Sequence, residues 1–351
     1  MQINQEKFQQ FINSALNEAA ATYHAALVVI GDKLGLYKAL AANDGLTPAE
    51  LAQQTGTAER YVREWLAAQT AGDYVMRDSK TDRYFLSPEQ AFALADPQGP
   101  DVAGLFCISS SVHHIEEKLT EAFRSGKGVS WDEHHPMMFH GVERFFRPGY
   151  VANLVSSWIP ALEGMETKLR CGARVADVGC GHGATTIIMA QAYPKSAFVG
   201  FDFHAPSVER ARKLAQEAGV ANRVTFEVAA AKSYPGKDYD LVTFFDCLHD
   251  MGDPIGAAAH VRETLNEDGA WMIVEPYAGD SLEENLTPVG RLYYSASTMI
   301  CTPASLSQEV GLALGAQAGE ARLRTVVTSG GFRHFRRAAE TPVNLIFEAK
   351  A

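Results

Sequence analysis

Apolar residues recur at helical spacing in the first part of the chain. Residues 8–19 carry one apolar face, which predicts a helix, and 25–40 predicts a second helix that stops near Asn43-Asp44-Gly45. Thr47, Pro48 and Glu50 form a capping box that begins a third helix, and a fourth runs from about residue 57 to Gly72. Two short apolar runs, 74–76 and 84–86, then flank a polar turn and predict a hairpin. Helices followed by a hairpin are the layout of a winged helix, which we expect over 1–98.

Residues 99–165 are predicted to be helical again, with many aromatic and histidine residues. His113, His114, His134, His135 and His140 all fall in this part of the chain. This composition suits a helical cover and pocket wall, and Phe139 and His140 are candidate substrate contacts. A metal site is not predicted, because adjacent residues such as His134 and His135 point in different directions.

The pattern changes to alternating strands and helices from about residue 166, which predicts an α/β domain with a parallel sheet over 166–351. Residues 270–276 read as a buried strand. The segments 332–339 and 344–349 read as a closing antiparallel hairpin, and 285–301 as a helix near the substrate.

One loop in this domain carries the strongest chemical signal. A short strand ends at Asp177 and leads through Gly179, Gly181 and Gly183 into a helix. Glycines allow a tight turn and a close approach of the backbone, and the helix N-terminus presents free N–H groups. The spacing GxGxG differs from GxGxxG and from GxxxxGK[ST], so we expect a nucleoside with a zwitterionic tail rather than a pyrophosphate. The alternative is a simple turn into a helix.

A second acid supports a nucleoside site. The strand over 197–202 ends at Asp202, 23 residues after Gly179. A carboxylate at that place can accept hydrogen bonds from both hydroxyls of a ribose.

The segments DVGCGHG and GFD resemble those of class I S-adenosylmethionine (SAM)-dependent methyltransferases. The resemblance implies a Rossmann-like seven-stranded sheet, with Asp177 and the three glycines around the methionine part of SAM and Asp202 on its ribose. It also implies that Phe203, Ala230, Ala231 and Asp246 lie near the cofactor. This family often has Gly-Asp where the chain has Ala230, so the adenine contact implied there would need the backbone or another side chain.

The segment Cys247-Leu248-His249-Asp250-Met251 is similar to the CxHDW segment of plant-type small-molecule O-methyltransferases. This resemblance implies that His249 is the general base, and the pKa of a free histidine, near 6.5, suits that role. The alternative is a histidine that orders the loop. The same enzymes dimerise through an N-terminal winged helix, and Tyr293 in the helix 285–301 is a candidate substrate contact.

Charge decides between two uses of the winged helix. The chain has 31 Lys and Arg against 42 Asp and Glu, for a net charge of −11. Its first 96 residues have eight basic and twelve acidic residues, and an acidic surface repels phosphate backbones. We therefore expect a homodimer module and no nucleic-acid partner.

Cysteine usage and hydropathy indicate the compartment. Five cysteines lie far apart without a CxxC pair, and no apolar run approaches the roughly 20 residues of a membrane span. We expect a cytoplasmic protein with no membrane segment and no structural metal.

These observations predict SAM-dependent methyl transfer to a small aromatic or hydrophobic molecule, with oxygen favoured as the acceptor atom. Nitrogen, sulfur and carbon acceptors stay open. One alternative is a SAM-responsive regulator that binds DNA or a protein without turnover, and another is methylation of a protein side chain.

Overall fold

The computed structural model describes residues 3–351, so Met1 and Gln2 of the expected 1–98 domain lie outside the described residues. The chain folds into two compact units. One contains the chain up to His113 together with Pro136–Pro148, and the other contains His114–His135 and Gly149–Ala351. The segment 99–165 therefore contributes residues to both units.

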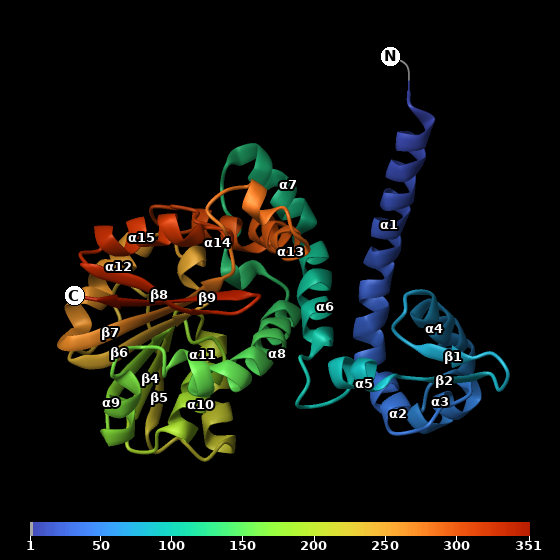
Figure 1. Ribbon diagram of the computed structural model, residues 1–351, viewed down its shortest axis with the longest axis horizontal. Coiled ribbons are helices and arrows are strands. Elements are labelled where there is room, and N and C mark those ends of the chain that lie inside the picture. Colours follow the sequence, from blue (N-terminus) through green and yellow to red (C-terminus); the bar gives the residue numbers. More distant parts are fainter. Residues whose placement is uncertain (1–2) are drawn as a thin grey trace. The chain divides into compact units, whose positions relative to one another are not determined.

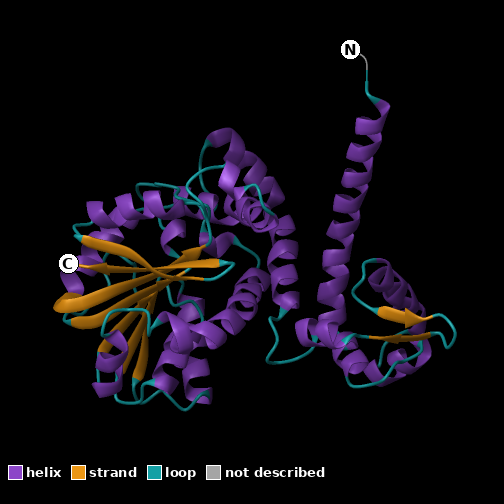
Figure 2. Ribbon diagram, viewed as in Figure 1, coloured by secondary structure: helices purple, strands orange, loops and turns teal. Residues whose placement is uncertain are grey.

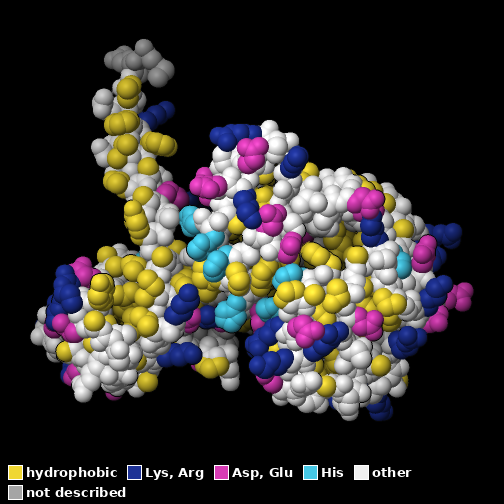
Figure 3. Space-filling model, turned by 180° about the vertical axis from the view of Figure 1, so that it is seen from behind, with side chains coloured by type: hydrophobic (Ala, Val, Ile, Leu, Met, Phe, Trp, Pro, Cys, Tyr) yellow, Lys and Arg dark blue, Asp and Glu magenta, His cyan; other side chains and the backbone are white. Residues whose placement is uncertain are grey.

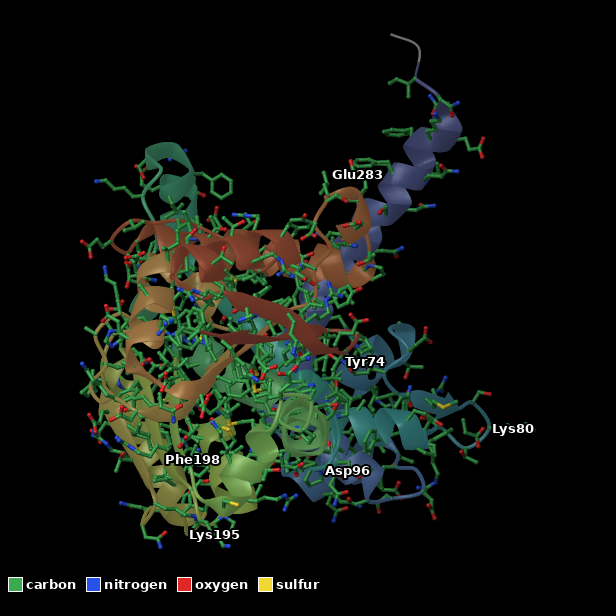
Figure 4. All side chains as sticks on the ribbon, turned by 60° about the vertical axis from the view of Figure 1, so that its left-hand side comes forward. Tyr74, Lys80, Asp96, Lys195, Phe198 and Glu283 are labelled. Carbon is green, nitrogen blue, oxygen red and sulfur yellow. The ribbon has the colours of Figure 1, made fainter. Side chains whose placement is uncertain are left out.

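The first unit has the helix and hairpin order expected of a winged helix (Figures 1 and 2). Its elements are α1 Gln5–Lys33, α2 Leu36–Ala41, α3 Pro48–Thr55, α4 Glu59–Ala71, β1 Met76–Asp78, β2 Arg83–Phe85, α5 Pro88–Leu94 and α6 Val102–Ser111. The predicted capping box is present, because the Thr47 side chain accepts from the Glu50 N–H and the Glu50 carboxylate accepts from the Thr47 N–H. Figure 4 labels Lys80, which lies in the turn between β1 and β2.

The helix predicted over 8–19 and the first part of the helix predicted over 25–40 form one helix, while the rest of the second prediction is the separate helix α2, which begins at Leu36 after Gly35. Helix α1 continues for 29 residues and stops only at Leu34, just before Gly35 in the left-handed region at φ +71°. The prediction of a break near residue 20 was wrong because the segment 19–24 contains three alanines and no glycine or proline, and alanine favours helix.

Helix α1 also exposes much of its apolar face. Phe11 is 70% exposed, Tyr23 is 78% exposed and Leu16 is 63% exposed. Yellow apolar side chains follow this helix in Figure 3. Several of the apolar side chains whose spacing predicted the helix are therefore exposed to solvent.

The core of the first unit lies beyond that exposed part. The Trp65 indole N–H donates to the Leu27 carbonyl at 2.9 Å, and the Tyr37 hydroxyl donates to the Gln69 side chain at 2.5 Å. These bonds fasten α4 to α1 and α2.

An ionic group joins three helices of the same unit. Arg144 of α8 (Pro136–Asn153) forms ion pairs with Asp32 at 2.6 Å and Asp101 at 2.7 Å. The three side chains are at most 30% exposed, so the pairing is well shielded from water.

The second unit is built on a seven-stranded sheet in the order β5-β4-β3-β6-β7-β9-β8. Only β9 and β8 run antiparallel to their neighbours, so the α/β sheet and the closing hairpin are confirmed. The strands are β3 Arg174–Val178, β4 Ala197–Asp202, β5 Val224–Val228, β6 Tyr239–Phe245, β7 Leu265–Pro276, β8 His334–Glu340 and β9 Asn344–Lys350.

The strand order reverses between β3 and β6. The chain passes from β3 outward to β4 and β5, then returns to β6 on the other side of β3 and continues to β7. In open α/β sheets, ligands bind outside the carboxyl ends of the strands at such a switch point. The Asp177 loop follows β3 and Asp246 follows β6, so both flank this point.

Helices cover both faces of the sheet (Figure 1). They are α9 Met165–Cys171, α10 Ala184–Ala192, α11 Ala205–Glu217, α12 Pro254–Thr264, α13 Pro288–Ala296, α14 Thr302–Leu306 and α15 Gly319–Ser329. The remaining helical pieces are α7 Glu116–Ser125 and the short η1 Val112–Ile115, η2 Trp131–Glu133, η3 Leu154–Trp158, η4 Leu248–Asp250, η5 Glu283–Asn285 and η6 Ser297–Cys301. Among residues 3–351, no helix combines the length and the apolar character needed to cross a bilayer.

Candidate active site

The glycine loop lies between β3 and α10, and all three glycines have left-handed backbone angles. Gly179, Gly181 and Gly183 have φ of +73°, +52° and +78°. A Cβ at Gly179 would lie 2.7 Å from the Cys247 sulfur, and one at Gly183 would lie 2.5 Å from the Phe226 ring. A Cβ at Gly181 would meet nothing within 4 Å. Gly179 and Gly183 are therefore needed for packing. Gly181, between them, faces open space where a ligand can approach the backbone.

Asp177 holds this loop against the helix that follows it. Its carboxylate accepts hydrogen bonds from the hydroxyls of Thr185 at 2.7 Å, Thr186 at 2.5 Å and Thr243 at 2.9 Å. Only 1% of Asp177 is exposed, and burial raises the pKa of its carboxyl to about 6 although the three hydroxyl bonds lower it. The acid that sequence analysis placed near the cofactor acts here on the chain's own hydroxyls, and so shapes the loop.

Asp202 lies at the end of β4 and faces the same loop. Its two carboxylate oxygens accept the backbone N–H groups of Gly181 at 2.9 Å and His204 at 2.8 Å. Burial raises the pKa of this carboxyl. A carboxylate has about four acceptor positions, so Asp202 can accept two further hydrogen bonds, as the hydroxyls of a ribose would require.

The predicted adenine-side residues follow the ends of β4 and β5. Phe203 is 53% exposed, and Ala230 is also exposed. The Ala229 N–H donates to the Asp202 carbonyl at 3.0 Å, which keeps the two strand ends together. Figure 4 labels Phe198, one of the residues at the other end of β4. The structure thus brings the glycine loop, Asp202 and Ala230 to one edge of the sheet.

His249 lies in η4, directly after β6, and is enclosed by acids. Its Nδ1 lies 2.5 Å from the Glu275 carboxylate, its Nε2 lies 3.2 Å from the Asp250 carboxylate, and only 4% of the residue is exposed. Burial lowers the pKa of His249, but the carboxylates of Asp250 and Glu275 outweigh burial and hold the pKa well above 6.5. This environment favours the imidazolium form, which has no free lone pair to accept a proton.

The side chains around His249 include types that bind metals. Ligand atoms of His249, Asp250 and Cys301 lie within 4.8 Å of one another. The His249 ring is already paired on both sides, with Glu275 at Nδ1 and Asp250 at Nε2. We therefore describe them as an ion-pair group, and the sequence prediction of no metal stays a prediction. Among the described residues, the histidine-rich segment around His134 forms no comparable group.

Asp246 is the first residue after β6 and has an unusual backbone. Its φ is +49°, in the left-handed region. Its carboxylate accepts the Tyr150 hydroxyl at 2.8 Å and the Asn344 side-chain N–H at 2.9 Å. Burial, followed by the charge of Glu275, raises the pKa of its carboxyl to about 7. Unlike Asp177, Asp246 is partly exposed.

The three candidate substrate contacts lie in different units. Tyr293 belongs to the second unit, where its hydroxyl donates to the Val343 carbonyl at 2.9 Å and burial raises the pKa of the phenol. Phe139 and His140 lie on α8 within the first unit. The structure therefore brings Tyr293 into the unit of His249 and Asp246, and assigns the other two to the winged-helix unit.

Sequence analysis missed two residues that hold the site together: Glu275 and Asn344. Glu275 had a signal, because an acid inside the buried strand predicted over 270–276 needs a partner. Asn344 had none, since it meets Asp246 only through the tertiary fold.

Arginine side chains of the winged helix form ion pairs with neighbouring carboxylates. On α4, Arg60 pairs with Glu64 at 2.6 Å and Arg63 with Glu59 at 2.5 Å. On the hairpin, Arg77 pairs with Asp82 at 2.8 Å and Arg83 with a carboxylate of α3 at 2.9 Å. The helix and wing that would meet DNA thus carry compensated charge, where a DNA reader concentrates positive charge.

Comparison with known proteins finds separate matches for the winged helix and for the domain with the seven-stranded sheet. Residues 169–328 match the family described as methyltransferase domain, and residues 22–96 match the Rv2258c-like winged HTH domain. The chain is 32% identical over 143 residues to 27-O-demethylrifamycin SV methyltransferase of Amycolatopsis mediterranei, covering 40% of this chain and 44% of that protein. The chain spans about half the length of the curated relatives it matches.

Solved structures resemble the chain over nearly its full length. The mitomycin 7-O-methyltransferase MmcR has a TM-score of 0.73 at 18% identity, covering 99% of each chain. Human N-acetylserotonin methyltransferase, solved in complex with SAM, has a TM-score of 0.73 at 16% identity, covering 97% of each chain. These similarities establish the fold, including the winged helix before the sheet. Residues 169–328 therefore match a methyltransferase domain, and residues 22–96, which precede them, match a winged helix-turn-helix domain.

Proposed function

We propose that the protein transfers a methyl group from SAM to a small aromatic or hydrophobic molecule. The observation that carries this proposal is the glycine loop, whose middle residue, Gly181, faces open space while its own N–H donates to Asp202. One carboxylate thereby orients the loop backbone and keeps acceptor positions for a ribose. The loop and the acid are thus oriented for a nucleoside before it binds.

The residues fit SAM in a simple division of roles. Asp202 would hold the ribose, the backbone of Gly179, Gly181 and Gly183 would surround the methionine part, and Phe203, Ala230 and Ala231 would border the adenine. Asp177 supports the loop through its three threonine partners. When bound, SAM supplies a methyl group on a positively charged sulfur.

Positioning is the main contribution that we assign to the chain. Holding two reactants in line converts a bimolecular reaction into an effectively unimolecular one. Oxygen is the favoured acceptor atom, because MmcR is named for methylation of an oxygen and has the same order of domains. The charge pairing on α4 gives no support to the regulator that was the alternative.

The cofactor proposal is tested by calorimetric titration with SAM. We expect the wild type to bind and Gly181→Asp to weaken the Kd at least about 100-fold, near 2.7 kcal/mol. The new side chain would occupy the open space at the loop and add a charge beside Asp202.

Gly219→Asp is the matched control, because Gly219 also has a positive φ, +69°, and open space within 4 Å. Both variants carry similar backbone strain, so only a site effect separates them. A wild type that does not bind SAM, or equal Kd values for the two variants, would refute the proposal.

We also propose a homodimer formed through the exposed face of α1. Phe11, Leu16 and Tyr23 leave an apolar stripe that a second copy can cover. In sedimentation velocity, Phe11→Asp should weaken the dimer at least about tenfold, near 1.4 kcal/mol, while Phe123→Asp on α7, also 76% exposed, should not. A wild type that is monomeric at micromolar concentration would contradict this proposal.

A cytoplasmic location remains part of the proposal. All five cysteines are free thiols, which suits a reducing compartment. Cell fractionation would test it directly.

A further inference from the structure

The backbone of Asp246 is held in a conformation that few non-glycine residues adopt. At φ +49° it lies in the left-handed region, directly beyond the carboxyl end of β6. Strain of this kind costs on the order of 1–3 kcal/mol and is retained mainly where function needs the resulting direction of the side chain. The position also flanks the switch point of the sheet, so the strain lies where ligands bind.

Asp246 differs in its partners from three buried acids of its unit and resembles Asp202, which also receives only two neutral donors. Glu275 faces His249, Glu348 pairs with Arg336 at 2.5 Å, and Asp177 receives three hydroxyls. Asp246 receives only two neutral donors, Tyr150 and Asn344, and within residues 3–351 it forms no ion pair with a basic side chain. Two acceptor positions of its carboxylate remain for a ligand.

The partners of Asp246 also show on which side of the site its carboxylate lies. Tyr150 comes from α8, and Asn344 begins β9, which lies beyond β7 in the sheet. The cofactor residues come from the ends of β3, β4 and β5, on the opposite side of β6. The carboxylate is therefore held toward the β7 and β9 side, away from the ribose acid Asp202.

We propose that Asp246 binds the methyl-accepting group of the substrate through an O–H or N–H and receives its proton during transfer. This inference rests on the proposed methyl transfer and moves Asp246 from the cofactor to the acceptor. The acceptor oxygen or nitrogen forms a bond to the methyl carbon, and the carbon–sulfur bond breaks with its electron pair left on sulfur. The proton leaves the acceptor atom for a carboxylate oxygen of Asp246, so charge and atoms balance.

In this proposal Asp246, and not His249, accepts the proton. The charged and titratable side chains around Asp246 are Tyr150 from α8, Glu275 from β7, His249 and Asp250 from η4, and Tyr293 from α13. The ring of His249 is turned toward two of the acids and is almost fully buried. An imidazolium there is paired with Glu275 and Asp250, and leaves Asp246, which is partly exposed as Asp250 is, outside this pairing.

The test compares two probe rings that differ in one hydrogen-bond donor. Binding of phenol and of anisole is measured by saturation-transfer NMR with S-adenosylhomocysteine present, so that no turnover is needed. We expect the wild type to bind phenol at least about tenfold more tightly than anisole, and Asp246→Asn to reduce this preference below about threefold. No preference in the wild type, or an unchanged preference in Asp246→Asn, would overturn the inference.

Asp240→Asn is the matched control, because Asp240 lies near the opposite end of β6 and binds the Arg174 N–H and the Asn266 side chain. Asp240→Asn should keep the wild-type preference for phenol over anisole. It should also keep the wild-type fold, which circular dichroism checks.

A second experiment distinguishes a failure of this inference from a failure of the proposed function. Transfer of labelled methyl groups from SAM is measured on phenols, anilines and thiols, together with SAM affinity. Loss of a general base typically slows transfer 10²–10⁴-fold, so we expect that loss in Asp246→Asn with an unchanged Kd for SAM. Normal SAM binding with undiminished transfer in Asp246→Asn would overturn the inference alone, whereas a wild type without SAM binding would refute the proposed function.

Discussion

The carboxyl ends of β3 and β6 lie side by side in the sheet, and an aspartate lies at each of them, Asp177 within the last residues of β3 and Asp246 directly after β6. Asp177 in β3 is 1% exposed and receives three threonine hydroxyls. Asp246 after β6 is partly exposed, has a left-handed backbone and receives two neutral donors. Two neighbouring strand ends thus hold one acid whose acceptor positions are filled by the chain and one that keeps room for a ligand. The first belongs to the scaffold of the loop, and we assign the second to the reaction.

The largest effect should come from removing the scaffold acid. Asp177→Ala leaves three buried hydroxyls without their acceptor, and we expect it to lower the free energy of unfolding by about 3 kcal/mol. Urea denaturation followed by fluorescence measures this loss. If the variant lost less than about 1 kcal/mol, the three threonine bonds to Asp177 would not hold the loop in place.

The reactive acid should behave in the opposite way. The folded-state pKa of Asp246, about 7, lies above its ordinary value of 3.8. As pH rises between these values, the unfolded chain releases a proton that the folded chain retains, so this group lowers stability progressively toward pH 7. Asp246→Asn removes that penalty, and we expect a gain of about 1–2 kcal/mol at pH 8 and almost none near pH 4.

Thermal unfolding of Asp246→Asn at the two pH values measures this difference. Asp240→Asn corrects for the loss of one negative charge from the same strand. A variant that is less stable than the wild type at pH 8 would remove the contrast between the two acids.

The smallest effect should come from one hydroxyl of the scaffold. Thr186→Val removes a single donor to Asp177 while Thr185 and Thr243 remain, and we expect a loss of about 1 kcal/mol. Thr325→Val on α15, whose hydroxyl bonds to the Ala321 carbonyl at an exposed position, is the control and should change stability little. Equal losses in the two variants would mean that the Asp177 network adds nothing to an ordinary hydroxyl bond.

Local sequence signals predicted most of the fold. The capping box at Thr47, the alternation of strands and helices, and the closing hairpin all depend on neighbours within a few residues, and all are present. The break within α1 was predicted wrongly, because apolar spacing was given more weight than the absence of a helix breaker between residues 19 and 24.

The site was predictable only in part. The glycines and Asp202 are adjacent to strand ends, where the chain order itself indicates their place. The partners that decide what each acid can do are distant in sequence: Asn344 is 98 residues from Asp246, and Glu275 is 26 residues from His249. Periodicity cannot identify such pairs, and the protonation of His249 depends on them.

The uncovered face of α1 also affects how stability should be measured. A helix of 29 residues leaves Phe11, Leu16 and Tyr23 exposed to water, so its apolar face would be buried further if a second copy covered it. If a second copy covers that face, mass action links folding to association, and the melting temperature rises with protein concentration. Comparisons between variants of this protein therefore need equal protein concentrations, since dilution by itself would lower the melting temperature.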